Sequence, residues 1–448
     1  MGHFLLKNAT IVNEGLSFKG GIFVKDGIIA DIFDYDIAGD CLRETAVSAA
    51  GVLDLRGMYL IPGVIDTHVH FREPGATHKG CISSESAAAV AGGVTSYLDM
   101  PNNNPPATSA TALAAKGEIA ARDSHANYGF YLGATDSNIG EVAAADSAGA
   151  CAVKVFMGSS TGNLLVSNPA SMLRVFERSP LMIAVHAEDN AIISANLKSF
   201  KSRYGDDIPF SAHPRIRSVE ACMAATRKAV ELALETGARL HIMHVSTARE
   251  VEYLAEVMRS TNRITAETCV QYLWFCDQDY ERYGAQIKCN PAIKSASDRD
   301  ALLDAVRSGV IKTISTDHAP HLPEEKQGGY LQAASGIPLV QYSLQMMLEL
   351  IKSGKITMQM VVERMCHAPA RLFAIERRGF IRKGYFADLV AFELGRPVSV
   401  PPLSRCGWSP VTEFSSTINY TFVNGVPVAR EGALTDAAPA GMKLIYTR

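Results

Sequence analysis

The 448-residue sequence lacks the paired cysteines of a disulfide-rich domain. Its nine cysteines are scattered, odd in number, and contain no Cys-x-x-Cys pair. Cysteine used in this way favours a reducing compartment, in which the side chain serves as a small apolar group. The chain also lacks an excess of either charge, because 43 basic and 46 acidic residues leave a net charge of −3. This balance gives no indication of a surface for nucleic acid or for a membrane.

Long apolar runs are absent as well. The segment Met1–Asn8 is too short in apolar residues for a signal peptide, and the Ala-rich stretch near Ala87 is interrupted by Gly92 and Gly93. We find no repeats, low-complexity tracts or long linkers. A hydrophobic content of 47% is ordinary for a soluble globular protein. These observations predict a cytoplasmic protein whose partners include neither a membrane nor nucleic acid.

The two ends of the chain share a pattern of short strands and turns. In residues 1–60 the pair Asp26-Gly27 is a hairpin signal, and in residues 379–448 the pair Asn424-Gly425 is another turn signal. The simplest arrangement joins both ends in one unit. We therefore predict a small β-sandwich domain built from residues 1–60 and 379–448.

Between these ends, in residues 61–378, apolar strands alternate with helical patterns such as Ser218–Glu235 and Arg249–Arg259. Such alternation is typical of α/β proteins with a parallel sheet. The eight strand candidates are Val64–His70, Val94–Met100, Asn127–Gly133, Cys151–Met157, Leu181–Ala187, Leu240–Ser246, Ile264–Val270 and Ile311–Asp317. Eight units of this kind predict a (β/α)₈ barrel over residues 61–378.

The first of these strands carries the most informative residues of the chain. Asp66, His68, His70 and Arg72 alternate with apolar or small residues, and this alternation predicts that the four side chains lie on one face of a strand. Two imidazoles at this spacing can bind the same metal ion. Imidazole suits zinc and similar divalent metals.

Further ligand-type residues occur near the ends of later strands, where a barrel of this kind places its active site. They are Lys154 on the fourth strand, His186 on the fifth, His244 on the sixth and Asp317 on the eighth. Taken singly, the histidines fit a role in the core, Asp317 fits a turn and Lys154 fits a lysine that reaches solvent. Their convergence on one rim favours a functional site. His241 has the opposite parity to His244 and is expected to face the helices.

Lys154 is flanked by Val153, Val155 and Phe156. A charged ammonium is costly in such surroundings without a partner. The neutral amine can instead react with carbon dioxide to form a carbamate, which is an anionic group able to bridge two cations.

The set Asp66-x-His68-x-His70, Lys154, His186, His244 and Asp317 resembles the amidohydrolase superfamily across essentially the whole chain. Several motifs are similar to those of the dihydroorotase family, namely His70-Phe71-Arg72-Glu73-Pro74-Gly75, Met100-Pro101-Asn102, Cys289-Asn290-Pro291 and Asp317-His318-Ala319-Pro320-His321. The resemblance implies reversible cyclisation of N-carbamoyl-L-aspartate to (S)-dihydroorotate, a step of pyrimidine synthesis. It also implies two zinc ions, bridged by Lys154 as N6-carboxylysine.

On this resemblance, His68, His70 and Asp317 are expected to hold one zinc ion, and His186 and His244 the other. The carbamate on Lys154 would bridge them. Asp317 is also expected to move a proton during ring opening and closure.

The substrate keeps one free carboxylate, which the planar guanidinium of Arg72 can bind. The resemblance adds Asn102 and His321 to this contact and Asn290 to the ring amide. His70, Ser335 and Gly336 complete the expected substrate contacts. For Asn102 a second interpretation stays open, because Pro-Asn-Asn-Asn-Pro is also a good turn sequence.

Two segments near the expected site leave questions open. The family usually has Phe-Gly, then Gly and Glu, near residues 335–341, where this chain reads Ser-Gly-Ile-Pro-Leu-Val-Gln. Gly336 is retained, so backbone contacts to the substrate are still expected. The small-residue segment 158–163 is either a mobile lid or an ordinary surface turn.

The alternatives are a dihydropyrimidinase or hydantoinase, an allantoinase, and a non-catalytic relative that uses the barrel as a scaffold. Arg72 and His321 favour dihydroorotase over the other hydrolases, because a neutral ring offers them no carboxylate. A homodimer is a further option that the sequence leaves open.

Overall fold

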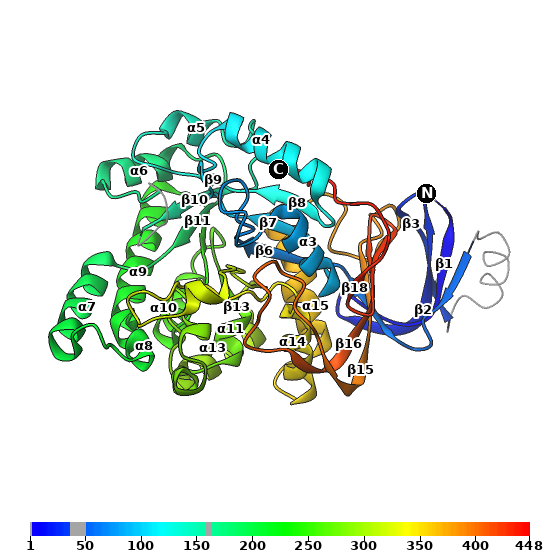
Figure 1. Cartoon of the computed structure of the whole chain (residues 1–448). Coiled ribbons are helices and arrows are strands. Elements are labelled where there is room, and N and C mark those ends of the chain that lie inside the picture. The colour runs from blue at the N-terminus through cyan, green and yellow to red at the C-terminus, as the bar shows by residue number, and fades with distance from the viewer. Residues whose placement is uncertain (1, 36–50, 158–163) are drawn as a thin grey trace.

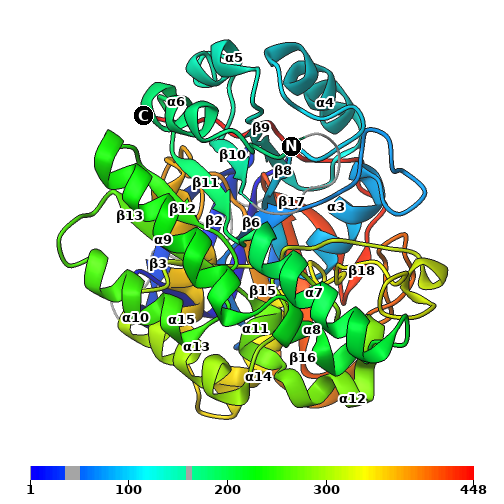
Figure 2. The same cartoon turned by 90° about the vertical axis from the view of Figure 1, so that its left-hand side faces the viewer.

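The computed structural model describes residues 2–35, 51–157 and 164–448. All eight predicted barrel strands are present and parallel, and the helices surround them (Figures 1 and 2). The strands are β6 (Val64–Val69), β7 (Val94–Asp99), β8 (Asn127–Phe130) with its continuation β9 (Leu132–Gly133), β10 (Val153–Phe156), β11 (Ile183–His186), β12 (Leu240–Ile242), β13 (Ile264–Cys269) and β14 (Thr313–Ser315). The (β/α)₈ barrel is therefore confirmed.

The barrel closes where its first strand meets the chain that follows its last strand. Neighbouring strands pair in the order β6-β7-β8 and β9-β10-β11-β12-β13-β14. Val69 forms a parallel bridge with His318, and the amide of His70 donates to the carbonyl of His318 at 2.8 Å. This seam places the residues after β6 and β14 side by side.

The helices begin and end where local chemistry directs them. Ser218 caps the helix that follows it by accepting from the amide of Ala221, and Gly237, with φ +71°, ends that helix in a left-handed conformation. The two predicted helices, Ser218–Glu235 and Arg249–Arg259, match α9 and α10 within two residues at each end. The α-helices are α3 (Ile82–Ala91), α4 (Ala110–Asp123), α5 (Ile139–Ala143), α6 (Pro169–Arg178), α7 (Asn190–Tyr204), α8 (His213–Ile216), α9 (Val219–Thr236), α10 (Ala248–Val257), α11 (Val270–Trp274), α12 (Tyr280–Tyr283), α13 (Ala296–Ser308), α14 (Ser343–Lys352), α15 (Met358–Val362) and α16 (Ala368–Leu372). The 3₁₀ helices are η1 (Phe210–Ala212), η2 (Asp277–Asp279), η3 (Gly284–Ile287) and η4 (Pro323–Lys326), and η5 (Glu363–His367) is a π-helix.

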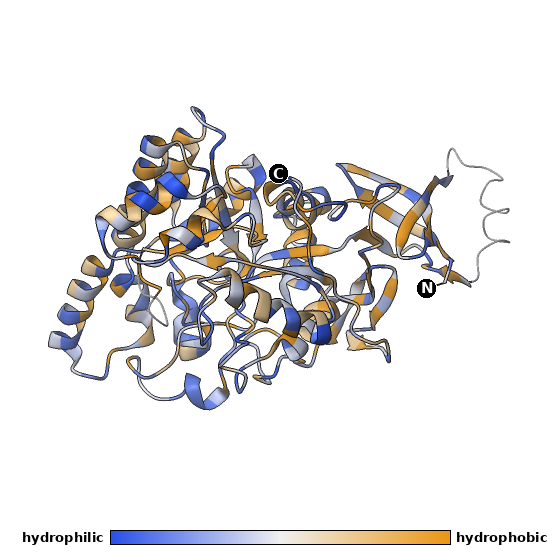
Figure 3. Ribbon diagram, turned by 90° about the horizontal axis from the view of Figure 1, so that it is seen from above, coloured by the Kyte–Doolittle hydropathy of each residue, from blue (hydrophilic) through white to orange (hydrophobic). Residues whose placement is uncertain are grey.

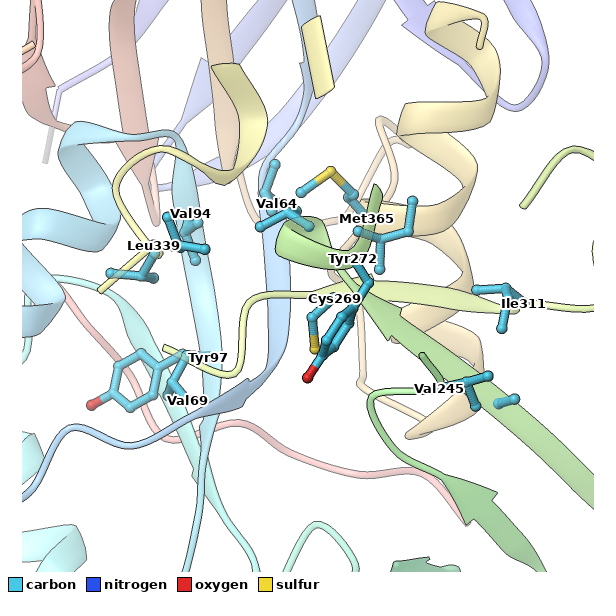
Figure 4. Packing of buried hydrophobic residues seen from close by; sticks show 14 of the residues in the cluster. Val64, Val69, Val94, Tyr97, Val245, Cys269, Tyr272, Ile311, Leu339 and Met365 are labelled. Atoms are coloured by element: carbon cyan, nitrogen blue, oxygen red, sulfur yellow. The ribbon is translucent and has the colours of Figure 1, made fainter. Parts of the chain in front are cut away.

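The barrel strands are buried on both faces, as parallel strands covered by helices usually are. One set of side chains, including Val64, Val94 and Ile311, belongs to the large apolar cluster shown in Figure 4. A second cluster contains Ile65 and Met243 together with residues from the C-terminal part of the chain. The surrounding helices carry both hydrophilic and hydrophobic residues, as amphipathic helices do (Figure 3). Within the described residues, no helix combines the length and apolar character needed to cross a bilayer.

Both chain ends contribute to one nine-stranded sheet beside the barrel (Figure 1). Its strands are β1 (Phe4–Asn13), β2 (Leu16–Lys25), β3 (Ile28–Asp34), β4 (Gly51–Asp54), β5 (Tyr59–Pro62), β15 (Leu389–Ser399), β16 (Glu413–Val423), β17 (Val426–Arg430) and β18 (Ala433–Leu434). The two halves join where β15 pairs with β5, and both contribute to one apolar cluster that includes Leu6, Ile22 and Leu389. The exact domain boundaries, 1–60 with 379–448 and 61–378, remain a prediction.

Both hairpin signals mark turns. Asp26 and Gly27 connect β2 to β3 with φ values of 52° and 82°, and Asn424 and Gly425 connect β16 to β17 with φ values of 52° and 76°. Two consecutive residues with positive φ are the signature of a type I′ turn, for which Asn-Gly and Asp-Gly are preferred.

Candidate metal centre

A cavity of about 360 Å³ lies at the carboxyl ends of the barrel strands. Its walls come from loops and strand ends that are far apart in the sequence. Every predicted site residue lines it: His68, His70, Arg72, Asn102, Lys154, His186, His244, Asn290, Asp317, His321, Ser335 and Gly336. The cavity also includes Phe156, Cys289, Ala319 and Ala334. The structure thus brings together all the residues that were predicted to share one site.

One candidate metal position is formed by three residues at the seam of the barrel. Asp317 Oδ1 lies 3.2 Å from His68 Nε2 and 2.9 Å from His70 Nε2. One ligand atom from each of these residues lies within 4.8 Å of the others. Although burial alone raises the pKa of Asp317, the neighbouring His68 and His70 hold it below its usual value. Asp317 is therefore a carboxylate at neutral pH and could serve as an anionic ligand.

A second candidate position lies between the ends of β11 and β12. His244 Nε2 is 2.8 Å from His186 Nδ1, so the two rings point toward the same place. Burial lowers the pKa values of His186, His244 and also His70, which keeps these imidazoles neutral. A neutral imidazole retains the lone pair that metal binding requires.

The outward-facing ring nitrogens have oxygen partners, which sequence reasoning missed. His68 Nδ1 lies 2.7 Å from Glu267 Oε1, and His186 Nε2 lies 3.0 Å from Glu188 Oε2. His70 Nδ1 lies 2.7 Å from the side-chain oxygen of Asn102. The oxygens of Glu267 and Asn102 accept from an imidazole N–H, so the opposite nitrogens of His68 and His70 keep their lone pairs toward the cavity. The contact between His186 and Glu188 lacks hydrogen-bond geometry.

This arrangement fits a divalent metal centre. Metal-binding histidines usually donate their second nitrogen to a carboxylate or amide oxygen, which fixes the tautomer and the ring orientation. His68 and His70 show that pattern, and imidazole with carboxylate is a common zinc donor set. Glu267 had a detectable signal in the sequence, because a lone glutamate in the apolar strand Ile264–Val270 needs a buried partner.

Lys154 is buried and lies on β10, which pairs with β11, the strand that ends at His186. Its Nζ is 2.7 Å from Met243 Sδ and 4.9 Å from the ring centre of Phe156. Among the described residues, no carboxylate forms an ion pair with it. Burial lowers the pKa of Lys154 to about 8, so a fraction of the side chain is a neutral amine at neutral pH.

The other end of the cavity is rich in hydrogen-bond donors. Arg72 Nε donates to the carbonyl of Pro320 at 3.2 Å, and its Nη2 lies 3.2 Å from His321 Nε2. Behind the wall formed by Ala334, Ser335 and Gly336, the buried amine of Lys326 donates to the carbonyls of Ala334 and Gly336 at 2.8 and 2.9 Å. Burial lowers the pKa of Lys326 to about 7. The charge of Arg72 favours an anionic ligand at this end.

Gly336 is required by its surroundings. Its φ is +149°, and a Cβ atom at this position would lie 2.5 Å from the carbonyl oxygen of Ala319. Only glycine fits such a conformation and approach. The retained glycine therefore lets the backbone of residues 335–336 form part of the cavity wall.

Asp66 and His241 lie elsewhere than their strand periodicity predicts. Asp66 does not line the cavity, because its carboxylate accepts from the Thr316 hydroxyl at 2.6 Å; irregular pairing between β6 and β7 breaks the predicted alternation. The placement of His241 against the helices is wrong, since its Nε2 lies 3.3 Å from Glu267 Oε2. Strand β12 ends at Ile242, and His244 has φ +40°, so strand parity does not extend between the two histidines. The predicted lid at 158–163 lies outside the described residues.

Comparison with known proteins places the chain in a family. The model of the Amidohydrolase family matches residues 59–428. A dihydroorotase from Halobacterium salinarum is 34% identical over 399 residues, which is 86% of this chain and 91% of that protein. An allantoinase from Bacillus velezensis is 31% identical over 401 residues, which is 88% of this chain and 85% of that protein.

A solved structure of an L-hydantoinase from Arthrobacter aurescens has a TM-score of 0.92 and 28% identity, and covers 99% of this chain and 100% of that one. The names of these relatives share the hydrolysis of a cyclic amide but differ in substrate. Together with the histidine and carboxylate cluster at the strand ends, they show that this chain belongs to the amidohydrolase family and is a metal-dependent cyclic amide hydrolase.

Proposed function

We propose that the protein is a dihydroorotase, which interconverts N-carbamoyl-L-aspartate and (S)-dihydroorotate in pyrimidine synthesis. The observation that carries this proposal is that Arg72 and His321 lie side by side, 3.2 Å apart, in the wall of the cavity that also holds the histidine cluster. Dihydroorotate retains a carboxylate outside the reacting amide, whereas hydantoin, dihydrouracil and allantoin are neutral. A half-buried guanidinium such as that of Arg72 is best matched by a carboxylate.

We further propose that two zinc ions bind in the cavity. His68, His70 and Asp317 would hold one ion, and His186 and His244 the other. Lys154 would bridge them as N6-carboxylysine: the neutral amine adds to carbon dioxide, a C–N bond forms, and one proton is released. The absence of an ion pair between Lys154 and the described carboxylates supports this modification.

When bound, the two zinc ions would supply an activated water and a polarised carbonyl. Asp317 then acts as the proton carrier: in hydrolysis its carboxylate takes a proton from the attacking water and delivers it to the ring nitrogen that leaves. In cyclisation the same steps run in reverse. Closing the ring converts a carboxylate to an amide and takes up one proton overall, so lower pH favours dihydroorotate by mass action.

The remaining cavity residues would hold the substrate. Arg72, His321 and Asn102 would bind its carboxylate, and Asn290 with the backbone of Ser335 and Gly336 would bind the ring amide. The side-chain oxygen of Asn102 is 2.7 Å from His70 Nδ1, so its amide nitrogen is the atom suited to a carboxylate. His70 would thus contact both the metal and the substrate region.

Replacing Arg72 with methionine is expected to weaken substrate binding while leaving the metals in place. Charge-assisted hydrogen bonds contribute about 1.5–3 kcal/mol, so KM for dihydroorotate should rise about 10- to 100-fold. Steady-state kinetics and metal analysis of the same sample check this result. Complete loss of zinc from the variant would contradict the role given to Arg72.

The deciding experiment for the proposed function is turnover of dihydroorotate, dihydrouracil, hydantoin and allantoin by the zinc-loaded protein. Clear preference for dihydroorotate supports the proposal. The allantoinase and L-hydantoinase relatives make hydrolysis of a neutral ring the second candidate, and preference for such a ring would replace our assignment. A protein that binds no zinc and acts on none of these compounds would be a scaffold.

A cytoplasmic location and a homodimer remain predictions.

A further inference from the structure

We propose that Lys79 is a positioning residue that holds His321 in the tautomer able to bind a carboxylate. The inference rests on the proposed function, because it explains how His321 can assist Arg72 in binding the substrate carboxylate. Lys79 lies in the loop between β6 and α3 and is not among the residues that line the cavity. It therefore acts through His321 and does not touch the substrate.

The contacts of His321 determine which of its two ring nitrogens carries the proton. Lys79 Nζ lies 3.2 Å from His321 Nδ1, and an ammonium has donors only, so Nδ1 must accept. The proton then sits on Nε2, which lies 3.1 Å from the carbonyl oxygen of Ser335 and donates to it. This tautomer satisfies both contacts.

The opposite tautomer satisfies fewer contacts. With the proton on Nδ1, the ring N–H would face the Lys79 ammonium, and the Nε2 lone pair would face the Ser335 carbonyl oxygen. Glu325 Oε2 lies 3.6 Å from Nδ1, which is beyond hydrogen-bond distance. Only Arg72 Nη2, at 3.2 Å, would find a suitable acceptor in this tautomer. Two favourable contacts against one select the tautomer with the proton on Nε2. Burial, with the nearby charges of Arg72 and Lys79, lowers the pKa of His321 to about 2, so the ring is neutral and its tautomer matters.

The second step concerns the two groups that face the cavity. In the selected tautomer, Arg72 Nη2 and His321 Nε2 are both donors, so their 3.2 Å approach is not a hydrogen bond between them. Both residues line the cavity. An anionic oxygen satisfies two converging donors together, and a carboxylate supplies one. The Nε2 proton of His321 is then shared between this oxygen and the Ser335 carbonyl as a bifurcated hydrogen bond. In the other tautomer the Nε2 lone pair would repel the carboxylate.

Lys79 is itself held in place. Its Nζ forms an ion pair with Glu325 Oε1 at 2.7 Å, and Glu325 Oε2 accepts from the amide of Leu322 at 2.8 Å, at the start of η4. The side chains of Lys79 and Glu325 are 20% and 27% exposed, so the pair sits at the rim. Glu325 therefore holds Lys79, and Lys79 in turn holds the His321 ring from the side away from the cavity.

The test is the variant Lys79→Met, read by NMR of protein carrying ¹⁵N-labelled histidine, with His321→Asn used only to assign the signal. In the unmodified protein we expect His321 to show a protonated Nε2, and in the variant a shift of population toward a protonated Nδ1. KM for dihydroorotate should rise about tenfold, the effect of one lost ordinary hydrogen bond, with a much smaller change in kcat. Lys79→Arg, which keeps a donor, should restore both readouts.

Lys383→Met is the matched control, because Lys383 also forms a surface ion pair, with Asp31 on the β-sheet, far in sequence from the site. It should change neither the tautomer nor KM. An unchanged His321 signal and an unchanged KM in Lys79→Met would overturn the inference. The NMR readout needs no turnover. If the unmodified protein fails to act on dihydroorotate, the proposed function fails, while the hold of Lys79 on the tautomer is still measured separately.

Discussion

Replacing Lys154 with alanine is expected to remove activity by at least about a thousandfold, together with the paired metals. The reason is that Lys154 is buried among apolar groups, with no ion-pairing carboxylate among the described residues, and is proposed to supply the anionic bridge between two ions. Metal analysis and steady-state kinetics measure the two losses. Native mass spectrometry of the unmodified protein should show the added mass of one carbon dioxide, lost on treatment with acid.

Two controls separate this effect from misfolding. Lys154→Met keeps the length of the side chain and removes the amine, so the fold should persist with an unchanged or higher Tm, since a buried ammonium is costly. Activity should still be absent. In Lys154→Ala, a small carboxylic acid such as propionate can enter the space left and should restore part of the activity. An alanine variant with normal kcat and full metal content would disprove the bridge.

The second large effect is expected for Asp317→Asn. The amide has the same shape as the carboxylate but cannot accept and return a proton, and it is a weaker metal ligand. We expect kcat to fall by about 10²- to 10⁴-fold, the usual contribution of a general acid or base. The measurement is kcat at saturating substrate and saturating zinc, so that weaker metal binding does not account for the loss.

Glu324→Gln serves as the comparison for Asp317→Asn. Glu324 lies in η4, a few residues along the same loop, and is exposed. Loss of its charge should leave kcat unchanged. If Asp317→Asn with its zinc sites filled turned over dihydroorotate at the normal rate, the proton-carrier role would have to pass to another group.

The fold was predictable because its signals are local. Buried parallel strands appear as short apolar runs, and all eight runs correspond to strands. Asp26-Gly27 and Asn424-Gly425 mark turns, because their preference for positive φ is intrinsic to these residues. The joining of both chain ends in one sheet was an inference from simplicity, and the pairing of β15 with β5 explains it.

The site was predictable where residues lie at strand ends and less so elsewhere. Strand periodicity misplaced Asp66, because irregular pairing in β6 breaks the alternation of side chains. It misplaced His241 because β12 ends at Ile242, before His244. Glu188 and Lys79 could not be identified, since their roles depend on neighbours brought close by the fold. A charged residue inside an apolar strand, such as Glu267, is a signal that the sequence does contain.

The seam of the barrel has a consequence for how the protein reaches its working form. His70 and Asp317 are 247 positions apart in the sequence, yet their side chains meet at 2.9 Å where the ring of strands closes. A cation held by both residues would also cross-link the two ends of the barrel segment, and so offset the entropy of closing a very long loop. The candidate metal position at the seam cannot form before the last barrel strand docks against the first. An ion that binds there would then stabilise the closed barrel.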